Sequence, residues 1–269
     1  MQDKTEIHKF LPTGVKILVV DIETSPNLAY VWGAWKQNVA LKQMVSTGKM
    51  LSWAAKWVGI ENMMYDYNLN HGEDPLDDRG TVLSLHRLLD NADIIVTYNG
   101  KNFDIPYFQA RCIEMGLEPP SPYKHVDLFQ VVKQNFRMPH RSLDAVAKHL
   151  GLEGKKSHSG FELWVSCIAG DMKAWEEMIE YNIQDISVTE NVYRALRPWI
   201  KNHPNMGVFM PEEDEPVCPK CGGKHIHFRG YATTSVSRFR RFQCLNCGGW
   251  GRVRLSEKGS KKPQTVNEI

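Results

Sequence analysis

The sequence predicts an α/β fold, in which helices flank a mixed β-sheet, followed by a small cysteine-rich domain. Three observations support this prediction. Strand-like runs dominate the early part of the chain, and helix-like spacing dominates the late part, with strands and helices alternating in the middle. Two Cys-x2-Cys pairs lie near the C-terminus. The 269 residues are 42% hydrophobic and 24% charged. That composition is typical of a globular protein and excludes collagen-like and coiled-coil chains.

Short runs of β-branched and aromatic residues predict the strands, because such side chains suit a pleated, buried surface. The predicted strands are residues 15–20, 30–35, 50–58, 63–67 and 93–97. Apolar residues at intervals of three and four predict the helices. The predicted helices are residues 81–89, 105–115, 128–136, 142–150 and 172–199.

A change in composition near residue 200 predicts a domain boundary. Residues 201–216 combine prolines, a glycine and an acidic run, a pattern typical of a linker. The domain organisation that we expect is an α/β domain at 1–203, a linker at 204–216, a cysteine-rich domain at 217–256 and a disordered polar tail at 257–269.

Charge is distributed unevenly between these domains. Residues 216–262 contain 11 basic residues and one acidic residue, whereas residues 1–211 contain 22 basic and 25 acidic residues. A basic domain beside a mildly acidic one favours a polyanionic partner, most often nucleic acid. The alternative is a basic segment that only interacts with solvent.

The chain carries no apolar run of membrane-spanning length. The longest runs, such as residues 17–20, are far shorter than the ~20 residues that a transmembrane helix needs. The N-terminal residues are mixed in charge and lack the apolar segment of a secretion signal. The sequence therefore predicts a cytoplasmic protein without a membrane partner.

Two carboxylates directly follow the first predicted strand. Asp21 and Glu23 are two residues apart, so alternation along the strand places them on one face. Adjacent carboxylates repel each other unless a cation lies between them, and oxygen ligands suit Mg²⁺ or Mn²⁺. The alternative is a pair of ordinary surface acids.

Two further segments place carboxylates near predicted helices. Asp104 lies at the start of one helix, where an ordinary N-cap is the alternative interpretation. Tyr181 and Asp185 are four residues apart and share a face of the longest helix. A carboxylate at the packed side of a helix is costly to bury unless it is paired or bound to metal. A tyrosine and an aspartate at the core boundary are the alternative.

In order and spacing, these segments resemble the three motifs of the DEDD 3′–5′ exonucleases, which have a ribonuclease-H-like fold. The motifs are Asp-x-Glu after the first strand, Asn-x-x-x-Phe-Asp after a later strand and Tyr-x-x-x-Asp on a late helix. The greatest similarity is to the proofreading-type domain of family B DNA polymerases. Tyr181 is typical of the tyrosine subtype (DEDDy), because the histidine subtype would need His where this chain has Glu180. The resemblance covers about residues 16–196.

The resemblance implies a metal-dependent active site. The implied ligands of two Mg²⁺ or Mn²⁺ ions are Asp21, Glu23, Asp104 and Asp185. Two such ions activate a water molecule and stabilise the leaving 3′-oxygen, so no serine or cysteine nucleophile is needed. The resemblance also implies that Tyr181 orients the attacking water.

Other residues of the motifs are candidates for substrate contact, namely Thr24, Asn99 and Phe103. Two more aspartates lie nearby in the sequence, Asp127 and Asp144. We expect Asp127 to mark a strand end and Asp144 a helix start. Asp127 is also a secondary candidate for the active site.

The cysteine-rich segment carries a metal-binding pattern. Two Cys-x2-Cys pairs, each followed by two glycines, are separated by 22 residues; the four cysteines are Cys218, Cys221, Cys244 and Cys247. Four thiolates in this spacing predict one tetrahedral, structural Zn²⁺, and the segment resembles a zinc ribbon. Disulfides or free thiols are the alternative. The isolated Cys112 and Cys167 are expected to be buried thiols.

Basic and aromatic residues interleave between the two cysteine pairs. Arg238, Arg240 and Arg241 alternate with Phe239 and Phe242. Such a surface suits phosphate contact together with base stacking on single strands. The alternative is that the aromatic side chains fill the small core and the arginines only contact solvent.

These features lead to three hypotheses of function. The first is a 3′–5′ exonuclease of DNA, with RNA also open, in the cytoplasm of a bacterium or phage-infected host. Its partners would be single-stranded or 3′-ended nucleic acid and a polymerase or other replication or repair protein. The second is an endonuclease or structure-specific nuclease of the same fold. The third is a non-catalytic adaptor, which the presence of all four carboxylates disfavours.

Overall fold

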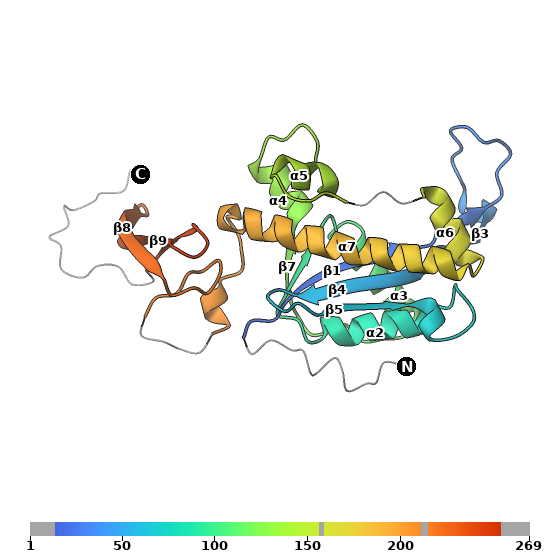
Figure 1. Ribbon diagram of the computed structural model, residues 1–269, viewed down its shortest axis with the longest axis horizontal. Helices are drawn as coiled ribbons and strands as arrows, with labels where there is room; N and C mark the ends of the chain where they lie inside the picture. The colour runs from blue at the N-terminus through green and yellow to red at the C-terminus, as the bar shows by residue number, and fades with distance from the viewer. Residues whose placement is uncertain (1–13, 156–158, 211–214, 254–269) are drawn as a thin grey trace. The chain divides into compact units, whose positions relative to one another are not determined.

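The computed structural model describes residues 14–155, 159–210 and 215–253 and divides into two compact units, 1–193 and 194–269 (Figure 1). The boundary between the units falls within the last helix of the first unit. The predicted tail at 257–269 lies outside the described residues.

The first unit is built on a five-stranded mixed sheet of order β5-β4-β1-β6-β7. Its strands are β1 (Ile17–Thr24), β4 (Met50–Trp57), β5 (Met63–Tyr67), β6 (Ile94–Thr97) and β7 (Lys124–Asp127). The central strand β1 pairs antiparallel with β4 and parallel with β6. The predicted mixed sheet is therefore confirmed.

Helices cover both faces of this sheet (Figure 1). The helices of the first unit are α2 (Arg79–Leu89), α3 (Asp104–Glu114), α4 (Leu128–Asn135), α5 (Leu143–His149), α6 (Phe161–Ile168) and α7 (Met172–Leu196). Leu18 and Val20 of β1 pack with α2 and α3 on one face. Leu51 packs with Trp175 and Met178 of α7 on the other. Because both faces of the sheet are covered, the sequences of its strands contain continuous apolar runs.

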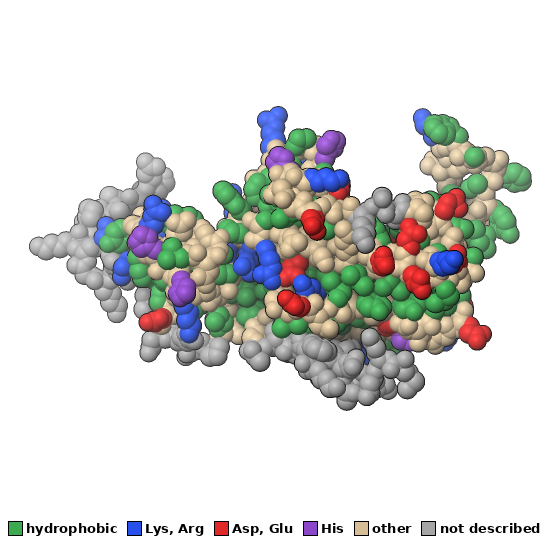
Figure 2. Space-filling model, viewed as in Figure 1, with side chains coloured by type: hydrophobic (Ala, Val, Ile, Leu, Met, Phe, Trp, Pro, Cys, Tyr) green, Lys and Arg blue, Asp and Glu red, His purple; other side chains and the backbone are tan. Residues whose placement is uncertain are grey.

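One predicted strand, residues 30–35, is wrong. After β1 the chain instead forms a protruding hairpin, whose short strands β2 (Leu28–Ala29) and β3 (Met44–Ser46) form a two-stranded sheet of their own. The side chain of Trp32 is 100% exposed. Figure 2 shows hydrophobic side chains gathered over this hairpin, at the upper right. Aromatic residues favour a strand only where a neighbouring layer covers them, and within the described residues the hairpin has no such cover.

The second unit contains a three-stranded antiparallel sheet of order β10-β9-β8. The strands are β8 (Ile226–Thr233), β9 (Arg238–Cys244) and β10 (Trp250–Arg252). Four short 3₁₀ helices complete the described structure; they are Leu41–Gln43, Asn68–Asn70, Arg197–Trp199 and Met206–Val208. Among the described residues, no helix has the length and apolar content that crossing a bilayer requires.

Candidate active site and metal centre

Strand β1 places Asp21 and Glu23 on the sheet face that α6 and α7 cover. Asn182 of α7 donates a hydrogen bond from Nδ2 to Asp21 Oδ2 at 2.8 Å. Trp164 of α6 donates from Nε1 to Glu23 Oε2 at 3.3 Å. The intervening Ile22 packs in the core on the opposite face. The predicted shared face of the two carboxylates is therefore confirmed.

The start of α3 brings Asp104 to the same strand. The backbone N–H of Ile22 donates to Asp104 Oδ1 at 3.2 Å, across 82 residues of sequence. Asp104 is the first residue of α3, and Phe103 occupies the N-cap position. The side chain of Asp104 is buried, and the residue is only 4% exposed. Its contact with β1 differs from the ordinary N-cap that was the alternative interpretation.

Helix α7 supplies Tyr181 and Asp185, which both contact Lys155. The Lys155 ammonium donates to the Asp185 carboxylate and, at 3.0 Å, to the Tyr181 hydroxyl. Sequence reasoning missed Lys155. It lies 30 residues from Asp185 in a segment without regular secondary structure, so no spacing pattern could have revealed the contact.

The carboxylates destabilise one another's charged forms; Asp104 and Asp185 are buried, and Asp21 and Glu23 are half-buried. Burial raises the pKa of Asp21 well above its ordinary value, and repulsion from the other three carboxylates raises it further. Burial also raises the pKa of Glu23, to about 8, and that of Asp104, to about 6. Attraction to Lys155 partly offsets the effect at Asp21 and Glu23. Lys155 interacts with Asp21, Glu23 and Asp185, so its single positive charge is outnumbered by the carboxylates around it. An excess of negative charge on hard oxygen ligands fits divalent cations such as Mg²⁺ or Mn²⁺.

A cavity of about 360 Å³ opens beside these groups. Its lining residues are Asp21, Tyr98, Asn99, Phe129, Arg141, Ser142, Leu143, Lys155 and Asp185. Of the three predicted substrate contacts, the cavity lining includes Asn99 but not Thr24 or Phe103. Asn99 has a positive φ of 70°, a conformation that asparagine tolerates better than most residues.

Asp127 has a structural role. It ends β7 and caps α4, and its carboxylate accepts hydrogen bonds from four backbone N–H groups. The donors are Asn99, Lys101, Phe129 and Gln130, at 2.9 to 3.3 Å. The predicted strand end is therefore confirmed. Asp144 lies in the first turn of α5, as expected of a helix start.

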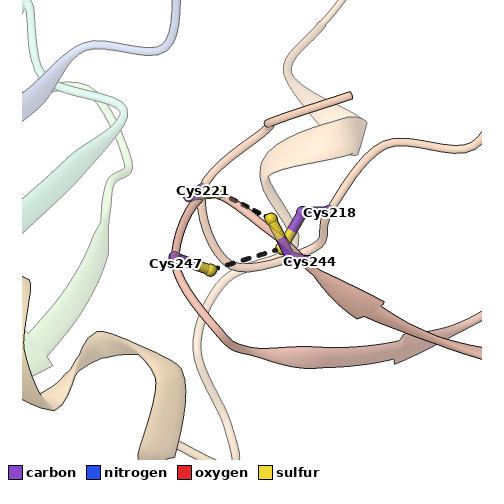
Figure 3. Close-up of side chains that lie close together, drawn as sticks. All are labelled: Cys218, Cys221, Cys244 and Cys247. Atoms are coloured by element: carbon purple, nitrogen blue, oxygen red, sulfur yellow. Dashed lines mark hydrogen bonds between the residues drawn. The ribbon is translucent and has the colours of Figure 1, made fainter. Parts of the chain in front are cut away.

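In the second unit, the four predicted cysteines converge (Figure 3). Their sulfur atoms all lie within 4.8 Å of one another, with Cys218–Cys247 and Cys221–Cys244 each at 3.7 Å. A tetrahedral site with Zn–S bonds of ~2.3 Å has edges of about 3.8 Å, which these separations match. A disulfide would need about 2 Å, so the cluster fits Zn²⁺ rather than the disulfide alternative. Cys112 and Cys167 are buried thiols, as predicted.

The strand register separates the three predicted arginines onto two faces of the ribbon sheet. Arg238 and Arg240 lie on the same face of β9, stacked over the rings of Tyr231 (4.2 Å) and Phe228 (3.9 Å). Arg241 points to the opposite face and lies 4.8 Å from the centre of the Trp250 ring.

The same sheet contains another arginine that sequence reasoning missed. Arg252 of β10 pairs with Arg241 and lies 3.7 Å from the centre of the Phe239 ring. Only the pairing of β9 with β10 reveals this neighbour, because Arg252 lies beyond the second cysteine pair in sequence. Arginine–aromatic pairs of this kind hold guanidinium groups in fixed positions on an exposed sheet.

Comparison with known proteins defines the class of this chain. Residues 18–197 match the profile of the RNase_H superfamily, and this match spans more than half of the chain. The chain therefore belongs to the RNase_H superfamily.

Within this class, the chain is similar to parts of archaeal DNA polymerases. It is 29% identical over 127 residues to DNA polymerase 1 of Pyrococcus abyssi, covering 39% of this chain and 16% of the polymerase. The DNA polymerase of Thermococcus litoralis is 28% identical over 129 residues, covering 39% of this chain and 8% of the polymerase. The family B DNA polymerase of Pyrobaculum calidifontis shares the fold, with a TM-score of 0.52 and 18% identity over 70% of this chain and 25% of that chain. The chain spans at most a quarter of these relatives.

Proposed function

We propose that this protein is a metal-dependent 3′–5′ exonuclease that hydrolyses DNA, with RNA as a second candidate substrate. One observation carries the proposal: three separate segments bring four carboxylates together beside an open cavity that Asp21 and Asp185 line. The similarity to DNA polymerases supports a nucleic acid substrate. The resemblance of the three motifs to the proofreading-type exonuclease domain supports the direction of hydrolysis.

The proposed ligands of two Mg²⁺ or Mn²⁺ ions are Asp21, Glu23, Asp104 and Asp185. When bound, the ions would activate a water molecule and stabilise the leaving 3′-oxygen. Tyr181 would position that water. Burial raises the pKa of Tyr181 to about 12, so its hydroxyl keeps its proton near neutral pH and can donate a hydrogen bond. Lys155 would act as a positioning residue, because its ammonium holds the Tyr181 hydroxyl and the Asp185 carboxylate in place.

Digestion of a 5′-labelled single strand, with DNA and RNA in parallel, tests the proposal. We expect a ladder that shortens from the 3′ end with Mg²⁺ or Mn²⁺ and is absent with EDTA. Discrete internal cuts would instead show an endonuclease. Tight binding without any cleavage would show an adaptor and would contradict the proposal.

Replacement of Lys155 tests its positioning role. We expect Lys155→Met to lower kcat by roughly 10- to 100-fold, the usual effect of losing a group that orients metal ligands, and Lys155→Arg to restore part of it. The double variant Lys155→Met/Tyr181→Phe should show a smaller fold-decrease in kcat than the product of the decreases in the two single variants, because both residues act through one hydrogen bond. Unchanged kcat in Lys155→Met, measured at saturating substrate, would contradict this role.

We also propose that the cysteine cluster holds one structural Zn²⁺ and that the ribbon arginines bind nucleic acid. Replacing Arg238, Arg240 and Arg241 with alanine should weaken single-strand binding. If each guanidinium neutralises one phosphate, the slope of log K against log salt should flatten by about 0.7 for each arginine replaced. Arg87→Ala, an exposed arginine on α2, is the matched control and should leave the slope unchanged. Equal slopes for the triple variant and the control would exclude the ribbon as the binding surface.

A further inference from the structure

The hairpin that follows β1 exposes aromatic side chains on an ordered backbone. We call residues 25–49 the aromatic hairpin. Its aromatic residues Tyr30 and Trp35 are each 79% exposed, and Trp32 is fully exposed. The backbone N–H of Tyr30 donates to the carbonyl of Gln43 at 2.9 Å, and Gln43 Nε2 donates back to the carbonyl of Tyr30 at 2.9 Å. The hairpin therefore presents its rings from a defined backbone.

The charge of the aromatic hairpin favours a polyanion. Residues 25–49 include three lysines, Lys36, Lys42 and Lys49, and no aspartate or glutamate. Lysine is depleted in the core of protein–protein interfaces. Exposed rings beside lysines suit single-stranded nucleic acid, in which bases stack on the rings and phosphates contact the ammonium groups.

The base of the aromatic hairpin is joined to the strand that carries Asp21. Ser25 follows β1 directly, and its N–H donates to the carbonyl of Lys49 at 2.8 Å. Gly48 lies so close to Ser25 and to Tyr107 of α3 that a Cβ there would be 2.4 Å from the Ser25 carbonyl oxygen and 2.8 Å from the Tyr107 hydroxyl. This close approach fixes where the hairpin leaves the sheet.

Aromatic side chains continue from this base toward the candidate active site. The ring of Tyr107 lies 5.8 Å from that of Phe103, which is half exposed and directly precedes Asp104. Rings are thus found beside Asp104, at the hairpin base and on the hairpin itself. Phe103 and the hairpin rings are exposed, whereas Tyr107 packs partly against the core. The exposed rings are available to the upstream nucleotides of a strand whose 3′ end lies at the carboxylates.

We propose that the aromatic hairpin binds single-stranded nucleic acid upstream of the 3′ end, through base stacking on Trp32 and Trp35 and phosphate contact at Lys36 and Lys42. Binding itself needs no catalysis. The placement of the bound strand relative to its 3′ end rests on the proposed exonuclease function.

The test measures the affinity of the full chain for a 5′-labelled oligonucleotide of about 20 nucleotides, enough to extend beyond one stacking platform. The buffer omits Mg²⁺ and Mn²⁺ to prevent hydrolysis and contains no chelator, so that the proposed ribbon zinc stays bound; fluorescence anisotropy reports binding. We expect Trp32→Ala/Trp35→Ala to raise Kd by about tenfold or more, since each stacked base contributes about 1–3 kcal/mol. Trp32→Phe/Trp35→Phe should retain most of the affinity. Leu41→Ala is the matched control, because Leu41 is an aliphatic side chain of the same hairpin and 91% exposed.

The outcomes separate this inference from the exonuclease proposal. Wild-type affinity in the double alanine variant overturns the inference and leaves a protein partner as the occupant of the hairpin. An equal loss of affinity in Leu41→Ala would show that base stacking on the tryptophans is not the cause of the weaker binding. If the wild-type protein hydrolyses no strand but the double alanine variant still loses affinity, the hairpin inference holds and the exonuclease proposal fails. If the wild-type protein hydrolyses the strand and the double alanine variant keeps wild-type affinity, only the hairpin inference fails.

Discussion

Replacing Asp21 with asparagine is expected to lower strand hydrolysis by about three orders of magnitude or more. A bound metal contributes several kcal/mol of transition-state stabilisation, and each ~1.4 kcal/mol is a factor of ten in rate. Asp21 interacts electrostatically with the other three carboxylates, so the variant removes the charge at the centre of the proposed ligand set. Initial rates on a 5′-labelled strand at saturating Mn²⁺ measure the loss.

The same substitution is expected to leave the metal-free fold as stable as before or more stable. Asp21 is half-buried beside the other three carboxylates, and the desolvation and repulsion of its ionised form cost folding free energy that asparagine does not. Active sites often carry such destabilising groups. Mn²⁺ should raise the Tm of the wild-type protein, because a ligand that binds only the folded state stabilises it, and should raise that of Asp21→Asn much less.

Glu176→Gln provides the matched control for this prediction. Glu176 is an exposed carboxylate on α7, the helix whose Asn182 contacts Asp21. The control should keep wild-type activity and the Mn²⁺-dependent rise in Tm. An Asp21→Asn variant that hydrolyses strands at a wild-type rate would remove Asp21 from the ligand set. A variant that is inactive only because it melts at a much lower temperature would show a structural role instead.

The sequence was sufficient to predict the parts of the fold that local pattern controls. Strand β1 begins as an uninterrupted apolar run because both of its faces are buried, and α7 shows helical spacing over its whole length. The four carboxylates could be selected because each follows or lies on an element that its own pattern predicts. Their convergence in space, by contrast, depends on the sheet order, which the motifs implied only through a family resemblance.

Features that arise from tertiary contact could not be predicted. The contact of Lys155 with Asp185 joins a loop to a helix, and the pairing of Arg252 with Arg241 depends on strand register. The aromatic run at 30–35 has the composition of a strand, but its neighbours in space decide whether it is one. Local pattern identifies residues suited to burial, whereas only the assembled sheet shows which of them stay exposed.

Removal of zinc is expected to unfold the ribbon while the first unit stays folded. Few apolar side chains stabilise the ribbon: among described residues 215–253, the buried apolar ones are Cys218, Phe242 and Cys244. Burying one phenylalanine contributes about 1.5–3 kcal/mol, whereas structural Zn²⁺ contributes roughly 10–16 kcal/mol in zinc-finger peptides. Hydrogen exchange with and without chelator measures the effect, with reduced protection expected in β8 and β9 and retained protection in β1 and β6.

Cys221→Ser should reproduce the effect of the chelator, because it removes one of four ligands from a site that needs all of them. Leu245→Ser is the matched control: Leu245 is 67% exposed and lies between Cys244 and Cys247 but offers no ligand. The ribbon arginines are held on aromatic rings of the same sheet, so unfolding it should also flatten the salt dependence of strand binding. Protection of β8 and β9 that persists in chelator would show that side-chain packing alone folds the ribbon. Loss of protection in both units together would show that their folding is coupled.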